Sequence, residues 1–143
     1  MDGNTRALVG EVFSALEDHD LERFRSLLHK DALMKNPATG AVHRGAEAIS
    51  EALRPVLRAF PDLTPEVKDV VVDEDQAAVE VVRVGTHTAE LELPAGTIPP
   101  TNQEVELAEC LILEQEEGKV ASITAYSDRQ MLTEQLNLEN NAA

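Results

Sequence analysis

Aromatic residues are scarce in this chain, at 3% of the total, and tryptophan is absent. Large aromatic side chains supply much of the buried area in most protein cores. A fold that encloses a deep space would be hard to fill with these residues, so we expect an internal pocket to remain. Cysteine occurs once, as Cys110, which excludes an internal disulfide.

Basic residues are also few: 12 Lys and Arg stand against 27 Asp and Glu, which gives a net charge of -15. Such a charge repels phosphate backbones and anionic lipid surfaces, so we expect no nucleic-acid partner and no membrane partner. No apolar run is long enough to cross a bilayer, and the opening Met-Asp-Gly-Asn does not resemble a leader peptide. We expect a soluble cytoplasmic protein.

Metal-ligating residues are dispersed. The four histidines are far apart in the sequence and no cysteine pair exists, so the sequence predicts no metal site. The length of 143 residues suits one domain, and no repeat, linker or low-complexity segment divides it. We predict a single domain over residues 1–143, with a tail that frays from about residue 139.

Apolar residues at helical spacing predict two short helices at the start of the chain and a third after Gly45. Asn4 or Thr5 can cap the first helix and Asp20 the second. Pro55 lies inside the third, where we expect a kink or a restart. The three apolar stripes are Leu8, Val12, Phe13 and Leu16; Leu21, Phe24, Leu27 and Leu28; and Ile49, Leu53, Val56, Leu57 and Phe60.

Alternating apolar and polar residues predict strands in most of the remaining chain. A short hairpin over residues 32–43 precedes the third helix, and further strands run from residue 67 to 126, before a short terminal helix. The longest predicted strand covers residues 77–93, and its return strand covers 105–114. This order predicts an α+β fold, in which three N-terminal helices pack on one face of a strongly bent, mostly antiparallel sheet.

Three polar residues interrupt the apolar face of the two long strands. Arg83 and His87 share that face of the outgoing strand with apolar odd-numbered residues, and Glu109 lies among the apolar residues of the return strand. Burial of such groups is costly unless they are paired or used in chemistry. These three residues are therefore the main candidates for a functional site.

Five short segments, taken in order, resemble the SnoaL-like polyketide (ester) cyclases of the nuclear-transport-factor-2-like superfamily. No single segment is specific, but their order is. The segments are Phe60-Pro61-Asp62-Leu63, Gly85-Thr86-His87-Thr88, Pro99-Pro100-Thr101, Glu117-Gly118-Lys119-Val120 and Gln135-Leu136.

The resemblance implies a cone-shaped α+β barrel with an internal pocket, in a protein that is often a homodimer. It implies an enzyme of natural-product metabolism that needs no cofactor. Such a cyclase closes a ring of a small apolar substrate by an intramolecular aldol reaction, in which a pocket acid/base removes a proton next to a carbonyl. Other members of the superfamily act as isomerases, epoxide hydrolases, dehydratases or hydroxylases, or only bind a ligand, so the fold does not fix the reaction.

The last predicted strand departs from the family pattern. The cyclases commonly carry an Asp-Tyr-Xaa-Asp segment there, whose first Asp is the candidate acid/base, whereas this chain reads Ala125-Tyr126-Ser127-Asp128. If the long hairpin is symmetric, His87 lies opposite Glu109, and the next hairpin places Glu109 beside Ala125. Glu109 would then bring a carboxylate close to the position of the missing acid.

These considerations give each candidate a role. Glu109 is the expected general base, and His87 orients it or donates to an enolate oxygen. Arg83 is expected to hold a carboxylate or ester carbonyl of the substrate. The full set of candidates is Glu109, His87 and Asp128 as catalytic residues and Arg83, Asn36 and Tyr126 as substrate-binding residues.

Ordinary structural roles remain open for the same residues. A buried pair of Glu109 with Arg83 or His87 can serve the fold alone. Asp128 can cap the terminal helix, Tyr126 can simply pack, and Asn36 and His43 are typical of a turn and of a surface strand. The sequence thus leaves open two functions, a proton-transfer enzyme and a non-catalytic protein that binds a small ligand.

Overall fold

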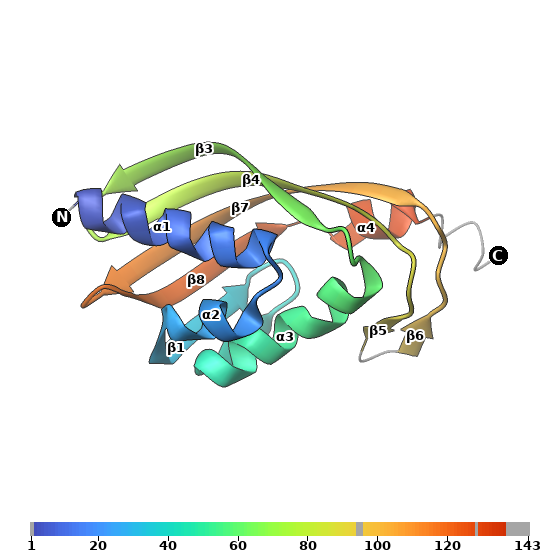
Figure 1. The fold of residues 1–143 in the computed structure, drawn as a ribbon, viewed down its shortest axis with the longest axis horizontal. Helices are drawn as coiled ribbons and strands as arrows, with labels where there is room; N and C mark the ends of the chain where they lie inside the picture. Colours follow the sequence, from blue (N-terminus) through green and yellow to red (C-terminus); the bar gives the residue numbers. More distant parts are fainter. Residues whose placement is uncertain (1, 94–95, 128, 137–143) are drawn as a thin grey trace.

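The computed structural model describes residues 2–93, 96–127 and 129–136 and shows an α+β architecture (Figure 1). Its helices are α1 (Asp2–Glu17), α2 (Leu21–Ser26), α3 (Ala46–Ala59) and α4 (Arg129–Gln135). Its strands are β1 (Leu28–Asn36), β2 (Ala41–Arg44), β3 (Thr64–Asp73), β4 (Gln76–Thr86), β5 (Leu91–Leu93), β6 (Gly96–Ile98), β7 (Glu104–Glu116) and β8 (Lys119–Ser127).

Six of these strands form one mixed sheet in the order β2-β1-β8-β7-β4-β3, and β5 and β6 form a separate hairpin. Neighbours in the large sheet are antiparallel, except that β1 and β8 are parallel. The sheet is open, with β2 and β3 at its edges. The described strands therefore do not form the closed barrel that the family resemblance implied.

Helices α1, α2 and α3 lie on the same face of the sheet (Figure 1). Their apolar stripes meet the inward residues of β4, β7 and β8 in one core, because side chains alternate between the two faces of a strand. The residues of this core with the least exposure include Val12, Phe24, Ile49, Val79 and Val81. On the opposite face of the sheet, Val71 and Tyr126 are 61% and 52% exposed.

Two predicted elements end earlier than the sequence indicated. The second helix ends at Ser26, and Leu28 already belongs to β1, so Leu27 and Leu28 were wrongly included in the helix. The long outgoing strand breaks after Thr86, and β5 is a separate strand paired only with β6. Helix α3, by contrast, continues through Pro55 to Ala59 as one element.

The predicted pairing of His87 with Glu109 is wrong, because Glu109 pairs with Val81. The regular ladder ends at Thr86 and Glu104, and the chain between them bends away to form the β5–β6 hairpin instead of a symmetric turn. On the next strand Glu109 pairs with Ser127, not with Ala125: the β7–β8 turn pairs Glu116 with Lys119, one residue from the predicted register, and the shift between Glu114 and Gln115 adds a second residue. The observed partners of Glu109 differ from the predicted ones by an even number of residues on both neighbouring strands. Arg83 and Glu109 therefore stay on the inward face of the sheet.

A second, smaller core lies where the end of α3 meets β5, β7 and α4. Phe60, Leu63, Leu91, Val105 and Leu136 are its fully buried large residues, all exposed by 4% or less. This cluster fixes the β5–β6 hairpin against α3. Leu63 also lines an internal cavity between the helices and the sheet, so the second core closes one end of that cavity.

Candidate functional site

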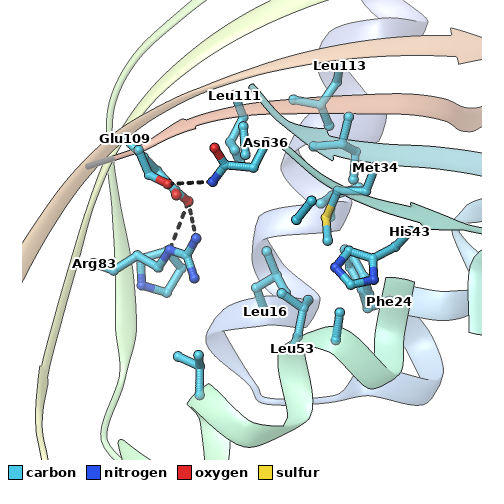
Figure 2. Close-up of a pocket in the computed structure, with 18 of the residues that line it drawn as sticks. Leu16, Phe24, Met34, Asn36, His43, Leu53, Arg83, Glu109, Leu111 and Leu113 are labelled. Carbon is cyan, nitrogen blue, oxygen red and sulfur yellow. Dashed lines mark hydrogen bonds and ion pairs between the residues drawn. The ribbon is translucent and has the colours of Figure 1, made fainter. Parts of the chain in front are cut away.

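A cavity of about 230 Å³ lies between the three helices and the inward face of the sheet. Most of its wall is apolar and comes from every layer of the fold, as shown by Leu16, Phe24, Met34, Leu53 and Leu111 (Figure 2). Polar side chains gather at one end, where Arg83, Glu109 and Asn36 lie close together in the close-up. A ligand in this space would be held mainly by apolar contact and oriented by that polar end.

The central feature of the polar end is an ion pair between β4 and β7. Arg83 lies two residues beyond Val81, the partner of Glu109, so the two side chains meet on a diagonal. Arg83 Nε donates to Glu109 Oε1 at 2.9 Å, and Arg83 Nη2 donates to the same oxygen. The Glu109 side chain is 5% exposed and that of Arg83 28%. The carboxylate is thus held rigidly in a nearly dry environment.

The second carboxylate oxygen of Glu109 is left available. Oε2 accepts no hydrogen bond from the described residues, and it is not one of their fully buried unpartnered atoms. Since Glu109 lines the cavity, this oxygen opens onto it. Arg83 Nη1 likewise donates to no group in the described part of the chain. The pair therefore offers a free acceptor and a free cationic donor side by side.

Asn36 joins β1 to the end of β8. Its Nδ2 donates to Ser127 Oγ at 3.1 Å, while its Oδ1 accepts from the backbone N–H of Ala38 at 3.0 Å. Asn36 thus serves the turn that the sequence suggested and also lines the cavity. Ser127, which sequence reasoning missed, lines the cavity too, and its odd number on β8, shared with Ile123 and Ala125, was the signal for it.

His87 lies outside the cavity, in contact with the second core. It is fully buried and stacks on Phe60 with 5.2 Å between ring centroids. Its Nδ1 lies 2.9 Å from Thr101 Oγ1 and 3.3 Å from the Thr101 backbone N–H, and its Nε2 has no partner among the described residues. Burial lowers the pKa of His87, so the ring is neutral at pH 7. The expectation that it reaches Glu109 was wrong, because β4 ends one residue before it.

Of the remaining candidates, only one lines the cavity in the described part of the chain. Tyr126 is on the outer face of the sheet, because it alternates with Ala125 and Ser127, so the prediction that it binds substrate in the cavity is not supported by its position. Asp128 lies outside the described residues. His43, interpreted from the sequence as a surface residue, pairs with Met34 and lines the cavity across from Arg83 and Glu109 (Figure 2).

Residues 2–93, 96–127 and 129–136 contain no group of three His, Cys, Asp or Glu side chains that could hold a metal ion. No helix in that part of the chain is both long and apolar enough to cross a bilayer. The candidate site is the Arg83–Glu109 pair and its polar neighbours, which line the cavity.

Comparisons with solved structures agree on the fold. AclR from Streptomyces galilaeus, a proposed hydroxylase, is similar with 23% identity and a TM-score of 0.82 over 96% of this chain and 98% of its own. IdmH from Streptomyces antibioticus, a proposed polyketide cyclase, has 26% identity and a TM-score of 0.78 over 93% and 98%. TerC, crystallised with polyporic acid, has 16% identity and a TM-score of 0.74 over 94% and 98%.

Sequence comparison points to one family. No protein of curated function matches this chain. The family model for SnoaL-like polyketide cyclases matches residues 7–136, which include every element from α1 to α4 at least in part. The match covers far more than half of the sequence and agrees with the segments that first suggested it. The chain belongs to the SnoaL-like polyketide cyclase family.

Proposed function

We propose that the protein is a cofactor-independent, cyclase-like enzyme that acts on a small apolar carbonyl compound by acid/base chemistry. The observation that carries the proposal is the Arg83–Glu109 pair, in which one carboxylate oxygen is anchored and the other opens onto an apolar cavity. A general base must have a free lone pair within reach of a bound substrate. Glu109 Oε2 satisfies that requirement, and the pocket wall favours an apolar ligand.

The first step is removal of a proton from the carbon next to the substrate carbonyl. Glu109 Oε2 takes the proton, and the electron pair moves onto the carbonyl oxygen, which becomes an enolate. Arg83 stays beside both groups, and its free Nη1 can donate to that oxygen. The negative charge passes from Glu109 to the substrate while the net charge of the nearly dry site stays constant.

Ring closure follows from the same arrangement. The enolate carbon attacks a second carbonyl carbon of the same molecule, which forms the new carbon–carbon bond and leaves an alkoxide. The alkoxide takes back the proton held by Glu109, so the base is restored and no external reactant is consumed. The cavity contributes by holding the chain of the substrate folded, with its two reacting carbons close together.

The comparisons support a cyclase more than another reaction of the superfamily. IdmH, a proposed polyketide cyclase, is 26% identical to this chain. TerC, which shares the fold, was co-crystallised with polyporic acid, and this supports a small-molecule ligand here. AclR, a proposed hydroxylase with the same fold, represents the other reactions of the superfamily.

A non-catalytic ligand-binding protein is the second candidate. Ala125 stands where the family acid is expected, and the Arg83–Glu109 pair already satisfies much of the charge of both groups. A protein that had kept the pocket but lost its chemistry would show both features. The two candidates differ in whether Glu109 is needed for turnover or only for the fold.

Homodimer formation is a further part of the proposal. Helices α1, α2 and α3 leave one face of the sheet uncovered, and Val71 and Tyr126 are more than half exposed on it. The family resemblance implies that a second copy covers this face. Sedimentation of the purified chain tests this, and a monomer at micromolar concentration would contradict it.

Proton exchange with a simple ketone tests the proposed function. The probe is 2-tetralone, an apolar two-ring ketone whose protons next to the carbonyl exchange with D₂O when a base removes them. The wild-type protein should accelerate this exchange at saturating probe, and Glu109→Gln should lose the acceleration. Equal exchange rates for the two proteins would overturn the proposal, whatever their affinity for the probe.

A further inference from the structure

Ser127 lies directly across the β7–β8 pair from Glu109. The two residues are partners in the ladder and both line the cavity. Side chains of directly paired residues are close, with Cβ atoms roughly 4.5–5.5 Å apart. The hydroxyl of Ser127 is thus beside the proposed base, on the opposite side of it from Arg83, because β7 lies between β8 and β4 in the sheet.

Asn36 determines which hydrogen bonds the Ser127 hydroxyl can still make. The backbone N–H of Ala38 donates to Asn36 Oδ1 at 3.0 Å, which identifies that atom as the oxygen of the amide. The other atom, Nδ2, is therefore the donor in its 3.1 Å contact with Ser127 Oγ. Ser127 Oγ accepts this hydrogen bond, and its own proton is free for another acceptor.

No described residue accepts that proton. The contact with Asn36 is the single side-chain hydrogen bond that Ser127 makes in the described part of the chain. The hydroxyl is half-buried and faces the cavity. Three functional groups therefore come from three adjacent strands: a hydroxyl donor on β8, a carboxylate acceptor on β7 and a guanidinium donor on β4. Figure 2 shows the last two, Glu109 and Arg83, side by side.

We propose that Ser127 is a further catalytic residue, which donates a hydrogen bond to the substrate oxygen on which negative charge develops. We infer that Asn36 is a positioning residue, because its amide occupies a lone pair of Ser127 Oγ and turns the hydroxyl proton toward the cavity. The inference rests on the proposed function and adds to it a second donor, so that the base is flanked on both sides. The step moves no atom of Ser127, which only donates a hydrogen bond.

The first experiment removes the hydroxyl. Ser127→Ala should lower kcat for the exchange of 2-tetralone about 10²-fold, as removal of an oxyanion donor does in other enzymes. It should also weaken binding of 2-naphthol, a stable analogue of the enol, by roughly 3–10-fold, measured by fluorescence. Ser122→Ala is the matched control, because it removes the same atom from the outer face of the same strand. It should leave both quantities at the wild-type level.

The second experiment reverses the orienting hydrogen bond. Asn36→Asp keeps an oxygen for the Ala38 N–H but replaces the amide donor with a carboxylate, to which the Ser127 hydroxyl would donate instead. Its kcat should fall about as far as that of Ser127→Ala. In the Ser127→Ala background the same change should have little further effect. A large further loss there would show that the new charge acts directly, which would overturn the positioning role.

The outcomes separate this inference from the function on which it rests. If Glu109→Gln loses exchange while Ser127→Ala keeps wild-type kcat and wild-type affinity for 2-naphthol, the inference is overturned and the proposed function stands. If Glu109→Gln exchanges the probe at the wild-type rate, the proposed function fails and the inference fails with it. Thermal unfolding of each variant identifies any loss that comes from unfolding alone.

Discussion

Glu109 and Ala125 lie diagonally across β7 and β8, because Glu109 pairs with Ser127 and Leu111 pairs with Ala125. Diagonal neighbours on one face of a sheet are roughly 7–8 Å apart, within the combined reach of a long side chain and a short one. A carboxylate at position 125 and the carboxylate of Glu109 would thus face the same part of the cavity. Whether an acid at position 125 can replace Glu109 is therefore open to a direct test.

Glu109→Gln should abolish proton exchange while the fold and the affinity for 2-naphthol stay nearly unchanged. The amide keeps the shape of the side chain and can still accept from Arg83, but it cannot take a proton. General-base catalysis is worth about 10²–10⁴-fold in rate, and the loss should be of that size. Ala125→Asp in the Glu109→Gln background should restore part of the rate. A large loss of stability together with unchanged exchange would instead identify Glu109 as a structural partner.

Arg83→Met should destabilise the protein by about 1–3 kcal/mol, because it leaves the nearly buried Glu109 carboxylate without its partner. The free energy of unfolding in urea measures this. The double variant Arg83→Met with Glu109→Leu should recover most of the loss, since an apolar pair suits this environment. If the double variant is less stable than Arg83→Met alone, the cost lies in packing and not in the unpaired charge.

The parts of the site that follow strand alternation could be predicted, and those that depend on register could not. Alternation alone put Arg83 and Glu109 on one face, and the same alternation along β8 places Ser127 there with Ile123 and Ala125. A symmetric turn over residues 87–103 would have placed His87 opposite Glu109, but β5 and β6 within this range pair with each other and pack in the second core. Such a detour depends on contacts between distant segments, which local patterns do not contain.

In the fold, too, local features could be predicted and contacts between distant segments could not. Capping by Asp20, which accepts from the Arg23 N–H at 3.0 Å, and the apolar stripes of α1 and α3 are local features and were predicted well. The parallel pairing of β1 with β8 joins segments about ninety residues apart, and no local signal indicated it. His43 is half-buried on the edge strand β2 and lines the cavity, which depends on the packing of α3 on the β1–β2 hairpin and so has no local signal either.

Gly85→Ala should destabilise the protein by about 1–3 kcal/mol, because a side chain there would overpack a tight contact. A Cβ at Gly85 would lie 3.0 Å from Leu63 Cδ1, 3.1 Å from Leu63 Cα and 3.3 Å from Asp62 Oδ1. The backbone of Leu63 cannot yield easily, and Asp62 is held by the Thr86 N–H at 2.7 Å.

Gly10→Ala is the matched control for this prediction. Gly10 lies within α1, and a Cβ there would meet nothing within 4 Å. Alanine favours a helix by about 0.5–1 kcal/mol over glycine, so this change should stabilise the protein. Urea unfolding of both variants measures the difference, and equal effects of the two changes would show that the contact at Gly85 is not tight.

His87 should make the stability of the protein depend on pH in a way that His87→Gln removes. Burial lowers the pKa of His87 in the folded protein below its ordinary value of 6.5, so the unfolded chain binds the proton more readily. The stabilisation from the neutral ring is present above pH 6.5 and is lost as the pH falls through that value toward the lower folded pKa. Acid also neutralises some of the excess of carboxylates, which changes stability in both proteins alike. The quantity to measure is therefore the difference in unfolding free energy between wild type and His87→Gln. As the pH falls from 7.5 to 5.5, the wild type should lose stability relative to His87→Gln. A difference that stays constant over this range would show that the buried ring takes up its proton as easily as an exposed one.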